Sequence, residues 1–338
     1  QFEELKQLKS ACLETMFPIE EADVPAIRFK GFEGEWATTK LSQISRKVTT
    51  KNTDLKYRAT LTNSAERGIV NQRDYFDHDI SNGDNIRGYF VVEPDDFVYN
   101  PRISVTAPVG PINCNQLGYA GVMSPLYYVF RVDGIDKDYL SYFFKTTLWH
   151  KFMFDNGNNG ARFDRFSIAD DVFGQMPIIH PIDIEEQKKI ASFLQRLDEQ
   201  IASQQQQLER LKQMKQACLR SMFPQGGGKR LNIRYIGFEK EWIMVRLSDM
   251  AHRISTSGVS DKLPCVEFED IVAGEGVLNK DVYRKNVVKR GVEFEKHDVL
   301  FGKLRPYLKN ILYADFNGIA VGDFWVLRAS EAVDPYFL

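Results

Sequence analysis

The chain has 338 residues, of which 43% are hydrophobic and 27% charged, the balance of a globular protein with about two domains. No stretch approaches the roughly 20 apolar residues that a membrane span needs, and the charged N-terminus is not a secretory signal. A net charge of −2 does not point to nucleic acid, and four separated cysteines without a CxxC pair indicate a reduced, cytoplasmic setting rather than zinc or redox chemistry.

Residues 2–17 have the pattern of the last turns of a helix, and they begin an internal repeat. Residues 5–18 return 206 positions later as residues 211–224, and residues 27–36 return with the same spacing as residues 233–242. This period is far longer than the roughly 20–50 residues of a solenoid repeat. We therefore predict a duplicated unit made of a helix end, a linker and a large domain. Cys12 and Cys218 are equivalent in the repeat and are predicted to be small packing residues.

The first large domain combines short β-rich runs, at residues 97–99 and 127–132, with turn signals and one amphipathic helix at residues 137–155. This mixture predicts an α+β domain with a twisted sheet and long surface loops. Recognition residues tend to lie on such loops.

Residues 184–222 contain neither proline nor glycine and predict one helix of about 55–60 Å. Asp183 is its predicted cap, and acidic residues occupy its first turn. Apolar residues recur at alternating steps of four and three, which is typical of a coiled coil. The predicted seam consists of Ile190, Leu194, Leu197, Ile201, Leu208 and Leu211. Gln204 lies on the seam either as a register-fixing residue or as a tolerated exposed one. We predict that residues 2–17 pack antiparallel on the 190–201 end of this helix.

The second large domain follows a glycine-rich linker. Its residues 280–309 hold nine Lys or Arg against four acids, which indicates either a solvated surface or a contact with nucleic acid. The predicted fold class is α+β, with two similar domains of twisted β-sheet and helices joined by a long coiled-coil-like helix.

Signatures of catalysis are absent from the sequence. Tyr99-Asn100-Pro101-Arg102 lacks the second proline and the aromatic residue of an amine-methylating site, and no glycine-rich S-adenosylmethionine loop follows a strand. The glycines at 226–228 precede Lys229 and Arg230, which does not fit a phosphate-binding loop. The five histidines show no i, i+4 pair. We therefore expect no catalytic residue and no metal site.

Three segments carry a resemblance to a known family. They are residues 176–190, residues 233–242 and residues 294–307. The first is a proline-rich approach to the long helix, and Leu194 and Leu197 follow it. Together with the duplication, they make nearly the whole chain resemble the specificity subunit of type I restriction–modification enzymes.

The resemblance implies the end of one family helix at residues 1–18, a first target recognition domain at 19–180, a spacer helix at 181–224 and a second recognition domain at 225–338, incomplete at its C-terminal end. Each domain would read half of a bipartite site in double-stranded DNA. Two methyltransferase (modification) subunits and restriction/translocase subunits would be the partners. S-adenosylmethionine, ATP and Mg²⁺ would belong to those partners, with no cofactor in this chain. A spacer of 55–60 Å corresponds to about 16–18 base pairs.

Reading bases needs Arg, Lys, Asn or Gln at the edges of a groove, with other basic residues on phosphates. For each residue chosen on this basis, an ordinary surface role is the alternative. The predicted DNA-binding residues are Arg73, Arg102, Asn158, Asn159, Arg162, Arg165, Lys303, Arg305 and Lys309.

The repeat also bears on the ends of the sequence. The sequence begins inside a helix and stops inside the second domain, so we expect either a piece of a longer protein or a circularly permuted start with a shortened end. Two other functions remain open. The chain could be part of a fused methyltransferase–endonuclease whose catalytic regions lie outside it, or a coiled-coil scaffold that binds only protein.

Overall fold

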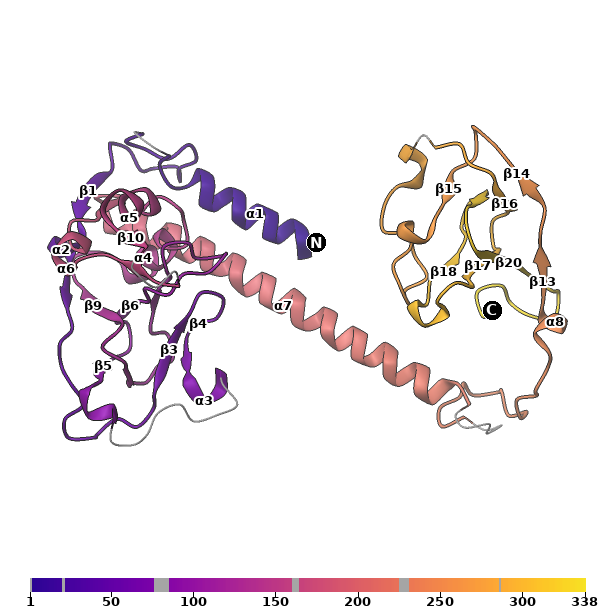
Figure 1. Ribbon diagram of the computed structural model, residues 1–338, viewed down its shortest axis with the longest axis horizontal. Helices are drawn as coiled ribbons and strands as arrows, with labels where there is room; N and C mark the ends of the chain where they lie inside the picture. The colour runs from indigo at the N-terminus through magenta and orange to yellow at the C-terminus, as the bar shows by residue number, and fades with distance from the viewer. Residues whose placement is uncertain (1, 20–21, 76–84, 160–163, 225–230, 286) are drawn as a thin grey trace. The chain divides into compact units, whose positions relative to one another are not determined.

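The computed structural model describes residues 2–19, 22–75, 85–159, 164–224, 231–285 and 287–338. The chain divides into two compact units, residues 1–215 and residues 216–338, each of which is described by itself (Figure 1). Both units combine sheets with short helices, as the α+β prediction requires. Among the described helices, none has the length and apolar character to cross a membrane. The predicted division into recognition domains and spacer stays a prediction.

The elements of the first unit alternate short strands and short helices. In chain order they are α1 Phe2–Thr15, β1 Ala37–Lys40, α2 Leu41–Ile44, β2 Ser45–Lys47, β3 Leu61–Ser64, β4 Gly68–Asn71, α3 Gln72–Tyr75, η1 Asn85–Gly88, β5 Phe90–Val92, β6 Phe97–Tyr99, β7 Ile112–Cys114, β8 Gly121–Met123, β9 Tyr128–Val132, α4 Lys137–Phe143, α5 His150–Asn156, β10 Asn158–Asn159, β11 Phe166–Ser167, α6 Asp170–Phe173, β12 Pro177–His180 and α7 Ile184–Met222.

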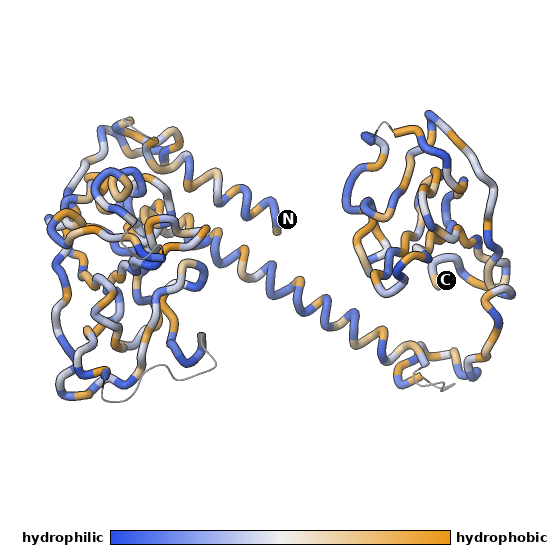
Figure 2. The backbone as a smooth tube through the Cα atoms, in the orientation of Figure 1, coloured by the Kyte–Doolittle hydropathy of each residue, from blue (hydrophilic) through white to orange (hydrophobic). Residues whose placement is uncertain are grey.

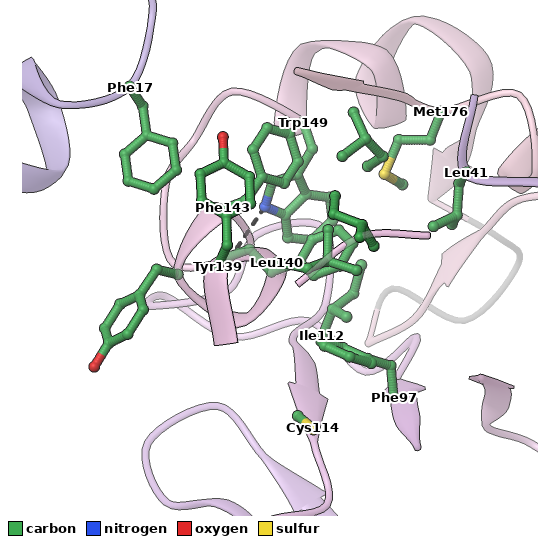
Figure 3. Packing of buried hydrophobic residues seen from close by; sticks show 14 of the residues in the cluster. Phe17, Leu41, Phe97, Ile112, Cys114, Tyr139, Leu140, Phe143, Trp149 and Met176 are labelled. Carbon is green, nitrogen blue, oxygen red and sulfur yellow. Dashed lines mark hydrogen bonds between the residues drawn. The ribbon is translucent and has the colours of Figure 1, made fainter. Parts of the chain in front are cut away.

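A four-stranded sheet in the order β2-β9-β6-β7 lies at the centre of the first unit. Successive side chains of a strand point to opposite faces. Phe97 and Tyr99 accordingly enter the large core that includes the helices, whereas Val98 enters a smaller core on the other face. Figure 3 shows the large core around Phe143 and Trp149. The sheet is therefore covered on both sides.

The single helix predicted for residues 137–155 is wrong, because the structure has two helices there, α4 and α5. The adjacent residues Thr146 and Thr147 explain the break. Threonine is β-branched and disfavours a helix, and the Thr146 hydroxyl donates to the Phe143 carbonyl at 2.7 Å, which closes the end of α4. Trp149 then turns inward, with its indole N–H donating to the Phe144 carbonyl at 3.3 Å.

Helix α7 runs unbroken over 39 residues with the predicted bounds, and the Asp183 carboxylate accepts the Glu185 N–H at 2.9 Å. Helix α1 packs against its first half. Cys12, Met16 and Phe17 share one core with the three seam residues Ile190, Leu194 and Leu197.

The predicted antiparallel docking of residues 2–17 is confirmed, because α1 runs in the opposite direction to the first half of α7 (Figure 1). Lys9 of α1 forms an ion pair with Asp198 of α7. Leu5 and Leu13 pack against the core, but Leu8 is 48% exposed.

The rest of the seam is uncovered in the structure. Ile201 is half-buried, whereas Leu208 and Leu211 are 43% and 50% exposed. Figure 2 shows that apolar residues nevertheless recur among hydrophilic ones along the whole helix.

The elements of the second unit begin after the linker. In chain order they are α8 Leu247–Met250, β13 Ala251–Ile254, β14 Ser257–Gly258, β15 Cys265–Val266, η2 Phe268–Asp270, η3 Val282–Lys285, β16 Gly291–Phe294, β17 Val299–Gly302, η4 Pro306–Leu308, β18 Ile311–Tyr313, β19 Gly318–Ala320 and β20 Phe324–Ala329.

The two units have the same sheet frame. The order β13-β20-β17-β18 in the second unit corresponds to β2-β9-β6-β7 in the first. The strand pairing agrees as well. In the second unit β16 pairs antiparallel with β19, as β5 does with β8 in the first unit. β15 pairs parallel with β19, and the equivalent in the first unit is a parallel bridge between Thr60 and Val122. The duplication seen at the ends of the repeat therefore extends through the interiors, although their sequences have diverged.

Candidate nucleic-acid interface

Two equivalent loops carry four of the predicted DNA-binding residues. One connects β6 to β7 and holds Arg102, and the other connects β17 to β18 and holds Lys303, Arg305 and Lys309. Each loop is closed by the same backbone hydrogen bond, from the Asn100 N–H to the Pro111 carbonyl at 2.9 Å and from the Gly302 N–H to the Asn310 carbonyl at 2.8 Å. Because the frames match, both loops leave the sheet at the same place.

A buried ion pair holds the strand before each loop. In the first unit, Asp96 is fully buried and accepts from Arg131 Nε at 2.6 Å and from a terminal guanidinium nitrogen at 2.9 Å. In the second unit, Asp298 accepts from Arg328 in the same way, at 2.8 and 2.9 Å. These hydrogen bonds raise the pKa of both arginines above the ordinary value. Both arginines therefore stay charged and brace their strands.

Sequence reasoning missed these ion pairs. Their partners are at least 30 residues apart along the chain. The available signal was a glutamate three residues before each aspartate, because the Glu93 and Glu295 carboxylates also pair with the two arginines, at 2.6 and 3.2 Å.

A groove of about 790 Å³ lies beside the loop in the first unit. Arg102 and Arg165 both line it and face each other across an antiparallel bridge, so the structure brings these two predicted residues together. The Arg102 side chain is 72% exposed and its contact with Asp164 is long, at 3.8 Å. The rim therefore offers a cation that is held only loosely.

The floor of this groove is polar but internally satisfied. The Asn63 amide donates to the Val98 carbonyl at 2.7 Å, and the Asn100 amide donates to the Asn63 carbonyl at 2.8 Å. The Asn113 amide donates to the Asn63 side chain at 2.7 Å. These amides therefore fix the base of the loop.

The other predicted residues of the first unit lie elsewhere. Arg73 lines a separate hollow of about 450 Å³ with Arg58, next to the groove because Thr60 borders both. Asn158 and Asn159 form β10, which pairs with β11, and Asn158 is exposed outside these hollows. Arg162 lies outside the described residues.

The loop of the second unit presents its charges openly. Lys303 pairs with Asp323 at 3.0 Å, and in the described part of the unit Arg305 and Lys309 form no ion pair. Arg305 and Lys309 have φ angles of 55° and 52°, a backbone region that costs about 1–2 kcal/mol for such residues. Tyr307 between them is 73% exposed. This is a strained, basic and aromatic tip.

Most of the basic run at residues 280–309 has another role. Lys285 donates to Glu267 at 2.6 Å and to Asp270 at 2.8 Å, and Lys289 donates to Glu267 at 2.7 Å. The hydrogen bonds from Lys285 and Lys289 lower the pKa of Glu267. These lysines stabilise the second unit internally, whereas Arg290, Lys296 and the 303–309 tip are exposed basic parts of the same run.

Within the described ranges, no three His, Cys, Asp or Glu side chains are grouped so that they could hold a metal ion. Burial raises the pKa of the Cys114 thiol to about 12, which makes it a poor nucleophile.

Residues 33–213, more than half of the chain, match the family model described as the type I restriction modification DNA specificity domain. No curated protein matches the sequence. Among solved structures, the HsdS subunit from Thermoanaerobacter tengcongensis is 14% identical with a TM-score of 0.42, covering 89% of this chain and 77% of that one. The type I restriction–modification S subunit from M. genitalium is 12% identical with a TM-score of 0.46, covering 90% and 75%.

Proposed function

The chain belongs to the family of type I restriction–modification DNA specificity domains, and from that premise we propose that its two units read the two halves of a bipartite DNA target. The chain contributes recognition, and its partners contribute the chemistry. We place the β6–β7 loop on one half-site and the β17–β18 loop on the other.

The observation that carries this proposal is the pair of equivalent loops with unlike residues. The strands, register and buried ion pair around them are the same in both units. The loops themselves differ in length and charge, with Arg102 in one and Lys303, Arg305 and Lys309 in the other. A common frame with different tips fits two readers of different sequences.

Arg305 and Lys309 suit DNA contact energetically. Since neither forms an ion pair in the described part of its unit, neither gives up a partner on binding. A bidentate arginine on guanine contributes about 1–3 kcal/mol of discrimination, and a lysine on a phosphate adds salt-dependent affinity.

The partners complete the system in this proposal. Two methyltransferase subunits methylate adenine with S-adenosylmethionine, and restriction/translocase subunits use ATP and Mg²⁺. The chain acts with them in the cytoplasm. The long helix spaces the two readers and offers a surface for the methyltransferase subunits.

The test is to map methylated adenines in cells that express the chain with its methyltransferase subunit. Arg102→Ala should relax the sequence of one half-site, and Arg305→Ala should relax the other. Each change should reduce discrimination at the affected base pair roughly 10- to 100-fold.

Lys296→Ala is the matched control, because Lys296 is exposed at the opposite end of β17 from the loop. It should leave both half-sites unchanged. If Arg102→Ala and Arg305→Ala relaxed the same half-site, or if neither altered the methylated sequence, the assignment of one unit to each half would be wrong.

A further inference from the structure

The tip of the β6–β7 loop in the first unit lacks the side chains that read a base through paired hydrogen bonds. Between Arg102 and Pro111 the sequence contains no Arg, Lys, Asn or Gln, and its side chains are apolar except for two hydroxyls. The tip of the second unit, residues 303–309, carries three cations instead. The two tips therefore present different chemistry to a ligand.

Val105 stands at the centre of the first tip and is 102% exposed, so in the described part of the unit no side chain covers it. A single exposed apolar residue is common on protein surfaces. Val105 differs because its backbone is fixed. The Ser104 N–H donates to the Ala107 carbonyl at 3.0 Å, and the Ala107 N–H donates to the Ser104 carbonyl at 3.2 Å. Residues 104–107 therefore form a closed turn with Val105 and Thr106 at its centre.

The two hydroxyls of the tip serve this turn. Ser104 Oγ accepts a hydrogen bond from the Ala107 N–H at 3.1 Å and lies 3.2 Å from the Thr106 hydroxyl. Both hydroxyls thus have a partner inside the turn, whereas the Val105 side chain has none that it would have to leave. Val105 is therefore the group of the tip that is best placed to contact a ligand.

Both ends of the tip are anchored to the rest of the unit. On one side, the Ile103 N–H donates to the Asp164 carbonyl at 3.1 Å. On the other side, the Tyr99 hydroxyl donates to the carbonyl of the buried Val109 at 2.9 Å. A side chain held in this way loses little conformational freedom on binding, which favours affinity.

The surroundings of Val105 favour duplex DNA as its ligand. Val105 lines the 790 Å³ groove together with Arg102 and Arg165. Two arginines on the same rim suit a polyanion, whose phosphates they can contact. The major groove of DNA admits a two-stranded β-ribbon such as β6–β7, and the feature there that an apolar side chain recognises is the C5 methyl group of thymine.

We propose that Val105 contacts the methyl group of a thymine, so that the half-site read by the first unit contains an A·T pair beneath the 104–107 turn. This inference rests on the proposed function, which places the β6–β7 loop on one half-site. It adds a specificity-determining residue that works through apolar contact, next to Arg102, which works through charge and hydrogen bonds.

Replacement of thymine by uracil tests this contact, because it removes only the C5 methyl group. The duplex carries the sequence that the wild-type complex methylates, and each thymine is replaced in turn in the half-site that Arg102→Ala relaxes. Competition binding then gives the Kd of the full chain together with its methyltransferase subunit. One replacement should weaken binding roughly fourfold, the effect expected for one buried methyl group.

The same replacement measured with Val105→Ala isolates the contact. Because the valine methyl groups are gone, uracil at that position should change the Kd less than about 1.5-fold, and this ratio does not depend on how well the variant binds overall. Val24→Ala is the matched control. It makes the same change at an exposed valine outside the groove and should keep the fourfold effect.

The outcomes separate this inference from the proposed function. A relaxed half-site without thymine, or an equal response of wild type and Val105→Ala to uracil at every position, overturns the contact with a methyl group. The separate effects of Arg102→Ala and Arg305→Ala would then still support one unit on each half-site. If Arg102→Ala relaxed neither half-site, the β6–β7 loop would not read DNA, and both proposals would fail.

Discussion

The buried ion pair before the β17–β18 loop gives a quantitative prediction. Arg328→Met would leave the Asp298 carboxylate, which is 1% exposed, without its cation. Loss of one partner from a fully buried pair costs about 3–5 kcal/mol. Here the Arg328 side chain is 38% exposed, so water can reach the carboxylate, and the Glu295 N–H remains as a donor. We therefore expect a loss of about 2–3 kcal/mol.

Hydrogen exchange measured by mass spectrometry can assign this loss to particular strands. The free energy of opening should fall in β13, β17 and β20, while β6 and β9 of the first unit should keep their protection. Adding Asp298→Leu to Arg328→Met removes the unpaired charge and should restore at least half of the loss, because an apolar pair leaves no buried charge.

The mirrored pair supplies the control. Arg131→Met should destabilise β2, β6 and β9 by a similar amount, since Asp96 is equally buried and Arg131 is 35% exposed. A loss below about 0.5 kcal/mol in both units would refute the idea that these pairs brace the strands. Equal loss of protection in both units from one substitution would refute the idea that each ion pair stabilises only its own unit.

Three further predictions follow from burial, charge and backbone geometry. Near neutral pH, Cys218 should react rapidly with a disulfide reagent, while the three buried thiols should react only after denaturation. Burial alone would raise the pKa of Asp198, but Lys9, Lys145 and the Tyr142 hydroxyl together lower it. At pH values above the unfolded pKa of about 3.9, the Asp198 carboxylate therefore stabilises the docking of α1. This stabilisation is lost as the pH falls through the lower pKa of the folded state. Cys12 should therefore become accessible to 4,4′-dithiodipyridine below about pH 4, and Asp198→Asn should weaken that pH dependence. Gly110→Ala should lower the free energy of unfolding by about 2–4 kcal/mol in thermal melts, because φ is +85° and the new Cβ would lie 2.1 Å from the Asn100 carbonyl oxygen. Gly118→Ala is the control: its φ is +75° but the new Cβ has open space, so it should cost only about 1–2 kcal/mol.

Local signals predicted the long helix well and the shorter one badly. The bounds of α7 follow from Asp183, an unbroken apolar period and the absence of glycine and proline, all of which can be read along the sequence. Residues 137–155 show the same apolar period, but the pair Thr146-Thr147 and the inward turn of Trp149 divide them. The threonine pair is a local signal and the inward packing of Trp149 is a tertiary one, and a periodicity argument includes neither.

Long-range pairing was beyond local reasoning. Strands of two to six residues, such as β15 and β20, carry too little pattern to identify partners more than 50 residues away. Arg102, Lys303, Arg305 and Lys309 were chosen from the sequence because Arg and Lys side chains contact bases and phosphates, and the structure places them on two loops. The equivalence of their positions emerged only from the shared frame, and their contacts with DNA stay a prediction.

The separation of frame from loop bears on how this molecule can change. Each hairpin is closed at its neck by one backbone hydrogen bond, at Asn100–Pro111 and at Gly302–Asn310, and neither bond depends on the side chains beyond it. A new loop sequence inserted between these closing pairs would be held by the same strands and the same hydrogen bond. The loop of one unit could therefore change the DNA sequence that it favours while the loop of the other unit keeps its own. Different loop sequences could then be exchanged between the same closing pairs while the supporting sheet stays unchanged.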